Sequence, residues 1–404
     1  MDKAVRTQLN GKTQSLAEKA FRLLLLVIWT QYTILSFAIQ IVRRLPIIGP
    51  LYEYVIPLTI IGLAFLSLPY LLRKVQAVDV VFYLVGVMIV LGTMALNYKN
   101  SEFIQQDLWR ILGAALPMLF IGVAYSHEDS QNDLFWASLI GTIAVFAYQI
   151  YLLSLGQELE ADNMNTAYMV LPSVMYLVYW ALEHKKLWHW VAASVSILLM
   201  FLFGTRGPII AELVFLLLGL LFSVFNRKSQ LAKLLCLLLF VTVIALVCTG
   251  DFLLNAAEFL SESFEEVGFS TRVFDRFIEG EMSEGSGRDV LYDAVINAIR
   301  EKPILGYGIM GDRPIVGIYV HNLFLEMWCH YGVIIGTIFL FGILVIPVAA
   351  LLKLRKTSMF NFVLMLTCMV FVKLMVSGSY TTEAYLFLLL GICVNVFRSQ
   401  KEKS

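Results

Sequence analysis

The chain has 404 residues, of which 59% are hydrophobic and only 15% are charged. Soluble globular domains carry about 25% charged residues, so this composition excludes a soluble domain and indicates a protein whose main solvent is lipid. The formal net charge is zero, which gives no reason to expect a nucleic acid as a partner.

A polar, basic segment of about 20 residues opens the chain, and an apolar run of about 21 residues follows it. This run is too long for the apolar core of a signal peptide, so we expect it to stay in the protein as a signal anchor. Further runs long enough to cross a bilayer as helices recur up to the C-terminus. The twelve predicted spans are residues 21–42, 54–72, 78–98, 108–125, 133–155, 165–182, 187–203, 207–225, 232–250, 322–350, 359–376 and 382–397.

The distribution of Lys and Arg predicts the orientation of these spans. With twelve spans both termini lie on one side, and the segments of that side hold 18 basic residues against four in the short loops opposite. Because positive charge is retained on the cytoplasmic side of a membrane, we expect a multi-pass protein with both termini in the cytoplasm.

One connection differs from the others, because residues 251–320 form a long polar loop on the predicted outer face. It carries 13 acidic residues against six basic ones. A loop of this length is usually functional or a small domain. We therefore divide the chain into spans 1–9 (residues 1–250), the exofacial, periplasmic loop (251–320) and spans 10–12 (321–404). The sequence shows no internal repeat, which counts against transporters built from two matching halves.

The clearest element of this loop is "SGRDVLYDAVINAIREKPILGYG", residues 286–308. Ser286 with Asp289 resembles a capping box, and Pro303 ends the helix. A helix of about 13 residues is too short and too polar to span a bilayer, so we expect it to lie at the outer membrane surface. Its apolar face is predicted to hold Val290, Leu291, Ala294, Val295, Ala298 and Ile299, and its polar face Asp289, Asp293, Asn297 and Arg300.

Two arginines stand where an anion could bind. Arg206 lies in "FGTRGPII", a short turn between two spans, where the flanking glycines and proline would present its guanidinium in a fixed place. Arg288 opens the amphipathic helix, whose N-terminus already offers free N–H groups and a partial positive charge. The alternative for Arg206 is a side chain that reaches to the membrane interface, and for Arg288 it is a pairing with an acidic residue of the loop.

His321 and Asn322 open the tenth predicted span, directly after the long loop. A lone histidine at a helix start is more often a structural hydrogen bonder than a catalyst. A neutral imidazole there could instead take a proton from a sugar hydroxyl, with Asn322 orienting it or binding the sugar. Further along the same helix, Glu326 and His330 are four residues apart, and we expect them to form a pair within the membrane.

The stretch "DNMNTAY" places Asn163, Asn165 and Thr166 where a span begins on the outer face, and these side chains could bind a sugar or cap the helix. The sequence has no HExxH, P-loop or GxSxG motif and no exofacial DxD of the kind that holds a metal–nucleotide pair. Its five cysteines all lie in apolar runs, which predicts no disulfide framework and no CxxC metal site. The usual sequence signals of a metal or nucleotide site are thus missing.

Three segments together resemble one family: the turn "GTRG", the loop segment "GRDVLYDAVINAIREKPILGYG" and the span start "HNLFLEMWCHYGVIIG". Their order is similar to that of the O-antigen ligase and polymerase superfamily, whose members end a long outer loop with a histidine–asparagine and an apolar helix. "NMNTAY" is similar to an asparagine-rich segment of the family, although Met164 stands where a proline is common. The resemblance covers residues 160–340 and implies an all-α polytopic, GT-C-like fold of about 12 transmembrane helices.

The resemblance implies a glycosyltransferase that moves a glycan from undecaprenyl diphosphate to an acceptor at the outer face of the inner membrane, without a metal or a nucleotide sugar. Carried onto this sequence, His321 would be the general base, and Arg206 and Arg288 would clamp the diphosphate. The acceptor hydroxyl needs a base because its pKa lies far above 7, whereas a diphosphate leaves readily once arginines neutralise it. Direct attack would invert the anomeric centre. The implied partners are the lipid-linked donor and acceptor glycans, membrane lipids and a regulator of chain length.

The transfer could be polymerisation, which extends one lipid-linked chain with another's repeat unit, or ligation, which delivers the chain to a lipid A core. Gly332 and Gly336 have the spacing GxxxG, whereas many ligases have GxxG. This departure and the compact acidic loop favour a polymerase of O-antigen or capsular repeat units. A transporter of polyprenyl-linked glycans is the alternative from another class. It requires charged residues along a central path, whereas those of this chain gather at the outer rim.

Overall fold

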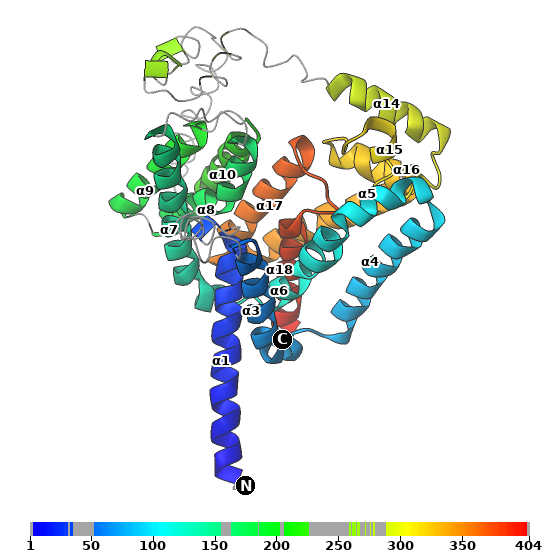
Figure 1. The fold of residues 1–404 in the computed structure, drawn as a ribbon. Coiled ribbons are helices and arrows are strands. Elements are labelled where there is room, and N and C mark those ends of the chain that lie inside the picture. Colours follow the sequence, from blue (N-terminus) through cyan, green and yellow to red (C-terminus); the bar gives the residue numbers. More distant parts are fainter. Residues whose placement is uncertain are drawn as a thin grey trace. The chain divides into compact units, whose positions relative to one another are not determined.

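The computed structural model describes residues 3–30, 33–34, 52–154, 163–184, 186–202, 206–225 and 288–401, with short stretches between 258 and 278. The regular elements of these residues are helices, without a strand among them (Figure 1). Within the described residues, five helical segments are long and apolar enough to cross a membrane: Ala77–Leu96, Tyr98–Ala124, His127–Tyr151, Leu323–Leu354 and Met359–Val376. The chain is therefore a helical, polytopic membrane protein.

The chain divides into two compact units, Met1–Ala137 with Gly287–Ser404, and Ser138–Ser286, and each is described by itself. The first unit contains α1 (Lys3–Trp29), α3 (Tyr52–Lys74), α4 (Ala77–Leu96), α5 (Tyr98–Leu108), the π-helix η2 (Trp109–Ala115), α6 (Met118–Ala124), the start of α7 (His127–Ser154), α14 (Arg288–Glu301), α15 (Arg313–Val316), α16 (Leu323–Leu354), α17 (Met359–Val376) and α18 (Ala384–Lys401). The second unit contains the rest of α7, with α8 (Asn163–His184), α9 (Leu187–Leu202) and α10 (Arg206–Phe225).

The predicted spans fall on helices wherever both can be compared. Those at 54–72, 78–98 and 165–182 coincide with α3, α4 and α8 within a few residues at each end. The span predicted at 108–125 is the second part of a longer apolar segment that runs from Tyr98 to Ala124 through η2. The span 232–250, the second half of the span 21–42 apart from residues 33–34, and much of the long loop lie outside the described residues. The number of twelve spans therefore stays a prediction.

The longest apolar run, predicted as one span over residues 322–350, is broken in the structure. At Gly332 of α16 the backbone is left-handed (φ 73°, ψ 170°), so 323–331 and 333–354 are two helices. A side chain at Gly332 would overlap the carbonyl oxygen of Ile304, and one at Gly336 would come within 2.7 Å of the carbonyl oxygen of Met327. Met327 and Gly336 are nine residues apart and would be about 13.5 Å apart in a straight helix. Because they are in contact, the first helix folds back onto the second. The second helix, about 33 Å long, still suffices to cross a bilayer.

The segment between α14 and α16 is held in place by this break. Backbone N–H groups of Tyr307 and Gly308 donate to the carbonyl oxygens of Cys329 (2.8 Å) and His330 (2.9 Å), and the N–H of Val333 donates to Pro303 (2.7 Å). On the other side, the amides of two asparagines at the corner between α4 and α5 donate to the carbonyl oxygen of Tyr307, namely Asn97 (2.6 Å) and Asn100 (2.8 Å). The loop that leads to His321 is therefore fixed between two helix ends.

The amphipathic helix is confirmed as α14, which packs against α15 and α16 (Figure 1). Its predicted polar residues are all exposed. Val295, Ala298 and Ile299 are buried, and burying Val295 and Ile299 contributes about 3–6 kcal/mol. Val290 was predicted for the apolar face, but it is 74% exposed. The apolar face of α14 thus covers the first part of α16.

Candidate functional site

His321 has an unusual backbone conformation for a residue with a side chain. Its φ is 57°, in the left-handed region, which costs an L-residue about 1 kcal/mol or more and persists only where the surroundings impose it. Such residues gather at functional sites. The ring is half-buried beside Tyr319, with 4.2 Å between the ring centroids. Among the described residues, no hydrogen-bonding group reaches its buried Nδ1 atom.

Positive charge surrounds the imidazole of His321. Burial lowers its pKa, and the guanidinium groups of Arg288 and Arg313 lower the pKa further, while Asp312 acts in the opposite direction. The imidazole is therefore neutral at pH 7 and able to accept a proton. Arg288, the partly buried first residue of α14, is close enough for its charge to act on this ring, so the structure brings these two predicted residues together.

Asn322 has a structural role that its sequence position left open. Its side-chain oxygen accepts hydrogen bonds from the backbone N–H groups of Phe324 (3.0 Å) and Leu325 (3.2 Å), as an N-cap residue does. This cap fixes the backbone directly after His321. The amide nitrogen of Asn322 remains the group that can face a substrate.

A buried polar network lies beneath this segment. The carboxylate of Asp312 accepts from the Arg313 guanidinium and from His330 Nε2 (2.9 Å) through Oδ1, and from the Val320 N–H (3.0 Å) through Oδ2. Arg313 also donates to Glu326 Oε1 (3.1 Å). Burial alone would raise the pKa of Asp312, but His330 and Arg313 together bring it below its ordinary value. Because an ionised carboxylate only accepts, His330 Nε2 carries a proton.

The segment 377–383 completes the network from the other side. Arg313 donates to the hydroxyl of Ser379 (2.8 Å), Ser379 in turn donates to Glu326 Oε1, and the N–H of Tyr380 donates to Glu326 Oε2 (3.2 Å). The hydroxyl of Tyr380 lies 2.8 Å from His330 Nδ1. Charged groups are costly inside a protein unless each finds a partner, and here both carboxylates are satisfied by the guanidinium, the imidazole and backbone N–H groups.

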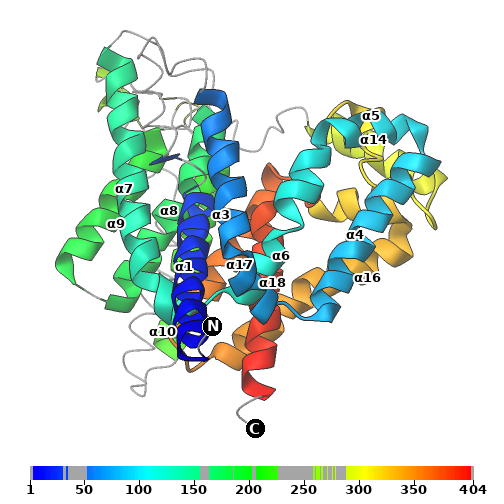
Figure 2. The same ribbon diagram turned by 60° about the horizontal axis from the view of Figure 1, so that its bottom comes forward.

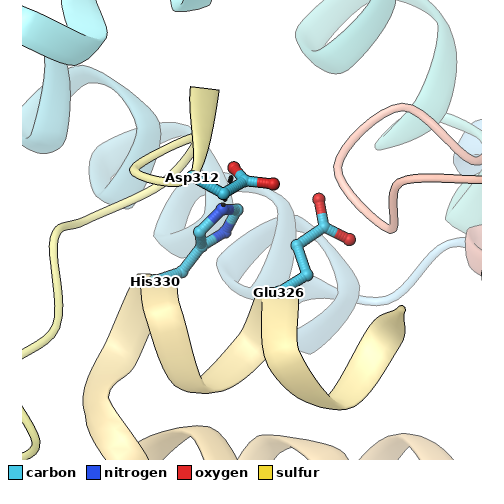
Figure 3. A group of neighbouring side chains, drawn as sticks. All are labelled: Asp312, Glu326 and His330. Atoms are coloured by element: carbon cyan, nitrogen blue, oxygen red, sulfur yellow. Dashed lines mark hydrogen bonds and ion pairs between the residues drawn. The ribbon is translucent and has the colours of Figure 1, made fainter. Parts of the chain in front are cut away.

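Asp312, Glu326 and His330 point toward one another in Figure 3, and one ligand-type atom from each lies within 4.8 Å of the others. A carboxylate–carboxylate–imidazole set of this kind can hold a divalent metal. However, the guanidinium of Arg313 already bridges the two carboxylates. These side chains therefore form an ion-pair network in which the Arg313 guanidinium is the cation.

The network changes one sequence prediction and adds residues that the prediction missed. Glu326 and His330 do share a helix face, but His330 bonds to Asp312 and Glu326 bonds to Arg313, so the two belong to a larger network. Asp312 and Arg313 were counted only among the charges of the long loop. An Asp–Arg pair inside the otherwise apolar stretch "GIMGDRPIVGIYV" was the signal that could have indicated burial.

An apolar cavity of about 330 Å³ lies in the first unit and is lined by residues of α4, α6, α16 and α18. Figure 2 shows the course of these four helices. Tyr331 and Tyr380, which belong to the network, line it near Val90 of α4. Asp79, near the start of α4, also lines it, about 16 Å along that helix from Val90. The remaining lining side chains are almost all apolar and include Phe82, Tyr83, Phe339, Ile343, Ile346 and Leu390.

The other predicted site residues belong to the second unit, Ser138–Ser286. Arg206 is the first residue of α10 and Asn163 the first of α8, and both side chains lie outside the described residues. Asn165 is exposed and Thr166 partly buried, both in the first turn of α8. Their roles therefore stay predictions, as does their placement relative to His321.

The comparison with protein families agrees with the motifs noted in the sequence. Residues 191–341 match the family model described as O-antigen ligase, and no curated protein matches the chain. The matched segment contains α14, the network residues Asp312, Arg313, Glu326 and His330, and His321 itself. It supports a glycosyl-transfer activity of the O-antigen ligase or polymerase type, in surface polysaccharide biosynthesis. Over residues 191–341, the match therefore supports the O-antigen ligase and polymerase superfamily, without deciding between a ligase and a polymerase.

Proposed function

We propose that the protein polymerises undecaprenyl-diphosphate-linked oligosaccharide repeat units into O-antigen or another surface polysaccharide, at the outer face of the cytoplasmic membrane. The observation that carries this proposal is His321: a half-buried, strained histidine beside Arg288, with a lowered pKa and a ring nitrogen that no described residue binds. A catalytic base needs a neutral imidazole at working pH and room for a hydroxyl beside it.

In the proposed reaction a ring nitrogen of the neutral His321 imidazole takes the proton of an acceptor sugar hydroxyl. The hydroxyl oxygen attacks the anomeric carbon of the donor, the bond from that carbon to the diphosphate oxygen breaks, and the configuration inverts. The electron pair leaves with the undecaprenyl diphosphate. The proton passes from His321 to solvent before the next turnover.

Arg288 and Arg206 are proposed to neutralise the diphosphate. Arg288 stands at the start of the 14-residue helix α14, where free N–H groups and the helix dipole also favour an anion. Arg206 is the first residue of α10 in the same way. A forked guanidinium can bind two phosphate oxygens at once, and no metal is then required to stabilise the leaving group. Asn322, Asn163, Asn165 and Thr166 are proposed to contact the sugars.

The apolar cavity suits part of the prenyl chain of a lipid-linked glycan. The lining residue Met327 lies on the first helix of α16, six residues after His321 in the sequence. This short separation supports a prenyl chain that enters the cavity beside a diphosphate held near His321. From there the cavity continues along α16 as far as Ile346. A polyprenyl tail would then lie below the head group, in the part of the protein that is most apolar.

A ligase is the second candidate, because the matching family model carries that description. The glycine spacing that favours a polymerase has a structural reason of its own, since Gly332 and Gly336 allow the break in α16 and the close approach of 323–331. The spacing therefore carries less weight than the sequence alone suggested. What still favours a polymerase is the compact acidic loop.

Purified protein in lipid nanodiscs, incubated with undecaprenyl-diphosphate-linked repeat units, distinguishes these functions. Lengthening of the lipid-linked glycan, seen by mass spectrometry and unaffected by EDTA, is the expected result. Transfer only when a lipid A core is present would make the protein a ligase. Absence of transfer to either acceptor, together with movement of the glycan lipid across proteoliposomes, would replace the enzyme proposal by transport.

A further inference from the structure

The buried network lies where it can control the backbone of His321. Asp312 is fully buried, and its Oδ2 atom holds the N–H of Val320, the residue directly before His321. On the other side, Asn322 is fixed by its cap on α16. The left-handed conformation of His321 is thus determined from both neighbours, which is the condition for a strained residue to persist.

The orientation of the Asp312 carboxylate is itself fixed. Its Oδ1 atom is bound by Arg313 and His330, and these two side chains are held in turn by Glu326, Ser379 and Tyr380. Arg313 also lies beneath the ring of Tyr319 (5.6 Å from its guanidinium carbon to the ring centroid), and the Tyr319 hydroxyl donates to the carbonyl oxygen of Ser377 (2.8 Å). The ring next to His321 is therefore anchored through the same segments.

We propose that Asp312 is a positioning residue for glycosyl transfer, whose carboxylate, oriented by Arg313 and His330, holds Val320 and keeps the His321 imidazole in its reactive place. The inference rests on the proposed role of His321 as the base. It assigns a task in the reaction to a carboxylate that touches no reacting atom. A purely stabilising network would instead affect the amount of folded protein and not the rate of each folded molecule.

Another Asp–Arg pair of the unit whose carboxylate is buried offers a matched control. Arg398 binds both carboxylate oxygens of buried Asp79 (2.6 and 2.7 Å), far along the chain from His321. Asp312→Asn keeps the size of the side chain but cannot accept from both His330 and Arg313 while also holding Val320. Arg398→Gln removes a comparable ion pair without touching the network.

The experiment compares both full-length variants with wild type in nanodiscs, by hydrogen exchange and by steady-state kinetics on lipid-linked repeat units. In Asp312→Asn we expect faster exchange at Val320 and its neighbours, and a kcat lower by about 100-fold with a donor KM within threefold of wild type. In Arg398→Gln we expect kcat per folded molecule and exchange near Val320 to be unchanged.

Three results would overturn the positioning role: an unchanged kcat in Asp312→Asn, an equal loss of kcat in Arg398→Gln, or unchanged exchange at Val320 in Asp312→Asn. Should Asp312→Asn not fold, Tyr319→Phe provides the second variant, because it removes only the bond to Ser377. It is expected to lower kcat about threefold to tenfold without changing the donor KM, and a wild-type kcat would count against the proposal. If wild type transfers no glycan at all, the proposed function fails. Hydrogen exchange still shows in that case whether the Asp312 carboxylate protects the N–H of Val320.

Discussion

Two Asp–Arg pairs with a buried carboxylate lie in the described part of the first unit, and they differ in what depends on them. Asp79 and Arg398 join α4 to α18 through two short hydrogen bonds, and Asp79 also caps α4 by accepting from the Gln76 N–H (2.9 Å). Asp312 and Arg313 instead belong to a network that reaches the strained residue His321. The first pair holds two helices together. The second holds Val320, and the next residue, His321, has a ring nitrogen that no described residue binds.

Burial and charge alone would not separate these two pairs, since both aspartates are almost fully buried. A buried ion pair is weak evidence for either stability or function, because desolvation offsets much of its attraction. The difference lies in the backbone that each carboxylate holds. A helix N-terminus is commonly capped in any protein, but a histidine in the left-handed region persists only where its surroundings impose that conformation, and such residues gather at functional sites.

The largest expected effect tests whether the second region serves catalysis at all. His321→Asn should lower kcat by about 100- to 10,000-fold, the usual contribution of a general base, with little change in thermal stability. Asparagine is the suitable replacement because it tolerates the left-handed conformation but cannot act as the base. Polymer formation by purified protein, followed by gel electrophoresis, gives the measurement.

His321→Ala supplies the comparison, because it removes the base and also places strain on the backbone. It should be as inactive as His321→Asn but less stable by about 1 kcal/mol. If His321→Asn polymerised at the wild-type rate, His321 would be a structural residue, and the difference between the two ion-pair regions would lose its functional meaning.

Much of the fold follows from the sequence, since hydropathy determines where the helices lie. The predicted polar face of α14 is exposed as expected. The break in α16 does not follow, because the apolar run continues through Gly332 and only the close approach of Ile304 explains the glycine. Hydropathy measures the preference of side chains for lipid, and it carries no information on which carbonyl group approaches from another segment.

The candidate site was predictable only in part, and for the same reason. His321 and Arg288 were noticeable because a polar residue at the border of an apolar span or at a helix start is costly unless it has a use. Asp312 and Arg313 were counted only among the many charges of the loop, although the apolar residues on both sides of the pair are a sign of burial. Their burial depends on Ser379, 66 residues further along the chain from Arg313, and no local pattern records that contact.

The second prediction concerns the charge around the base. Arg288→Gln should raise the donor KM about 10- to 100-fold, the effect of losing hydrogen bonds to a charged group. Because the Arg288 guanidinium lowers the pKa of His321, its removal should raise that pKa. The base is active when neutral, so the acidic limb of the pH–rate profile should move to higher pH.

Arg300→Gln is the matched control for Arg288→Gln, since Arg300 is exposed at the other end of α14 and donates to Asn297 Oδ1 (3.2 Å). Its donor KM and pH profile should equal those of wild type. An acidic limb that stayed in place in Arg288→Gln, with an unchanged KM, would falsify the assignment of Arg288 to the diphosphate and to the electrostatics of His321.

The smallest expected effect concerns the cavity between the two ion-pair regions. Ile343 lines it, whereas Ile338 on the same helix is 64% exposed and does not. Ile343→Trp should fill part of the cavity and displace a short length of prenyl chain. Displacement of two buried methylene groups costs about 1.6 kcal/mol, which is about 10-fold in donor KM.

A donor with a prenyl chain too short to reach Ile343 should be used equally well by wild type and by Ile343→Trp. Ile338→Trp should behave as wild type with either donor. Equal KM changes for long and short donors would mean that the tryptophan distorts α16, and no change with the long donor would place the prenyl chain elsewhere. The predicted pattern requires a prenyl chain that leaves the His321 region and passes Ile343 along α16.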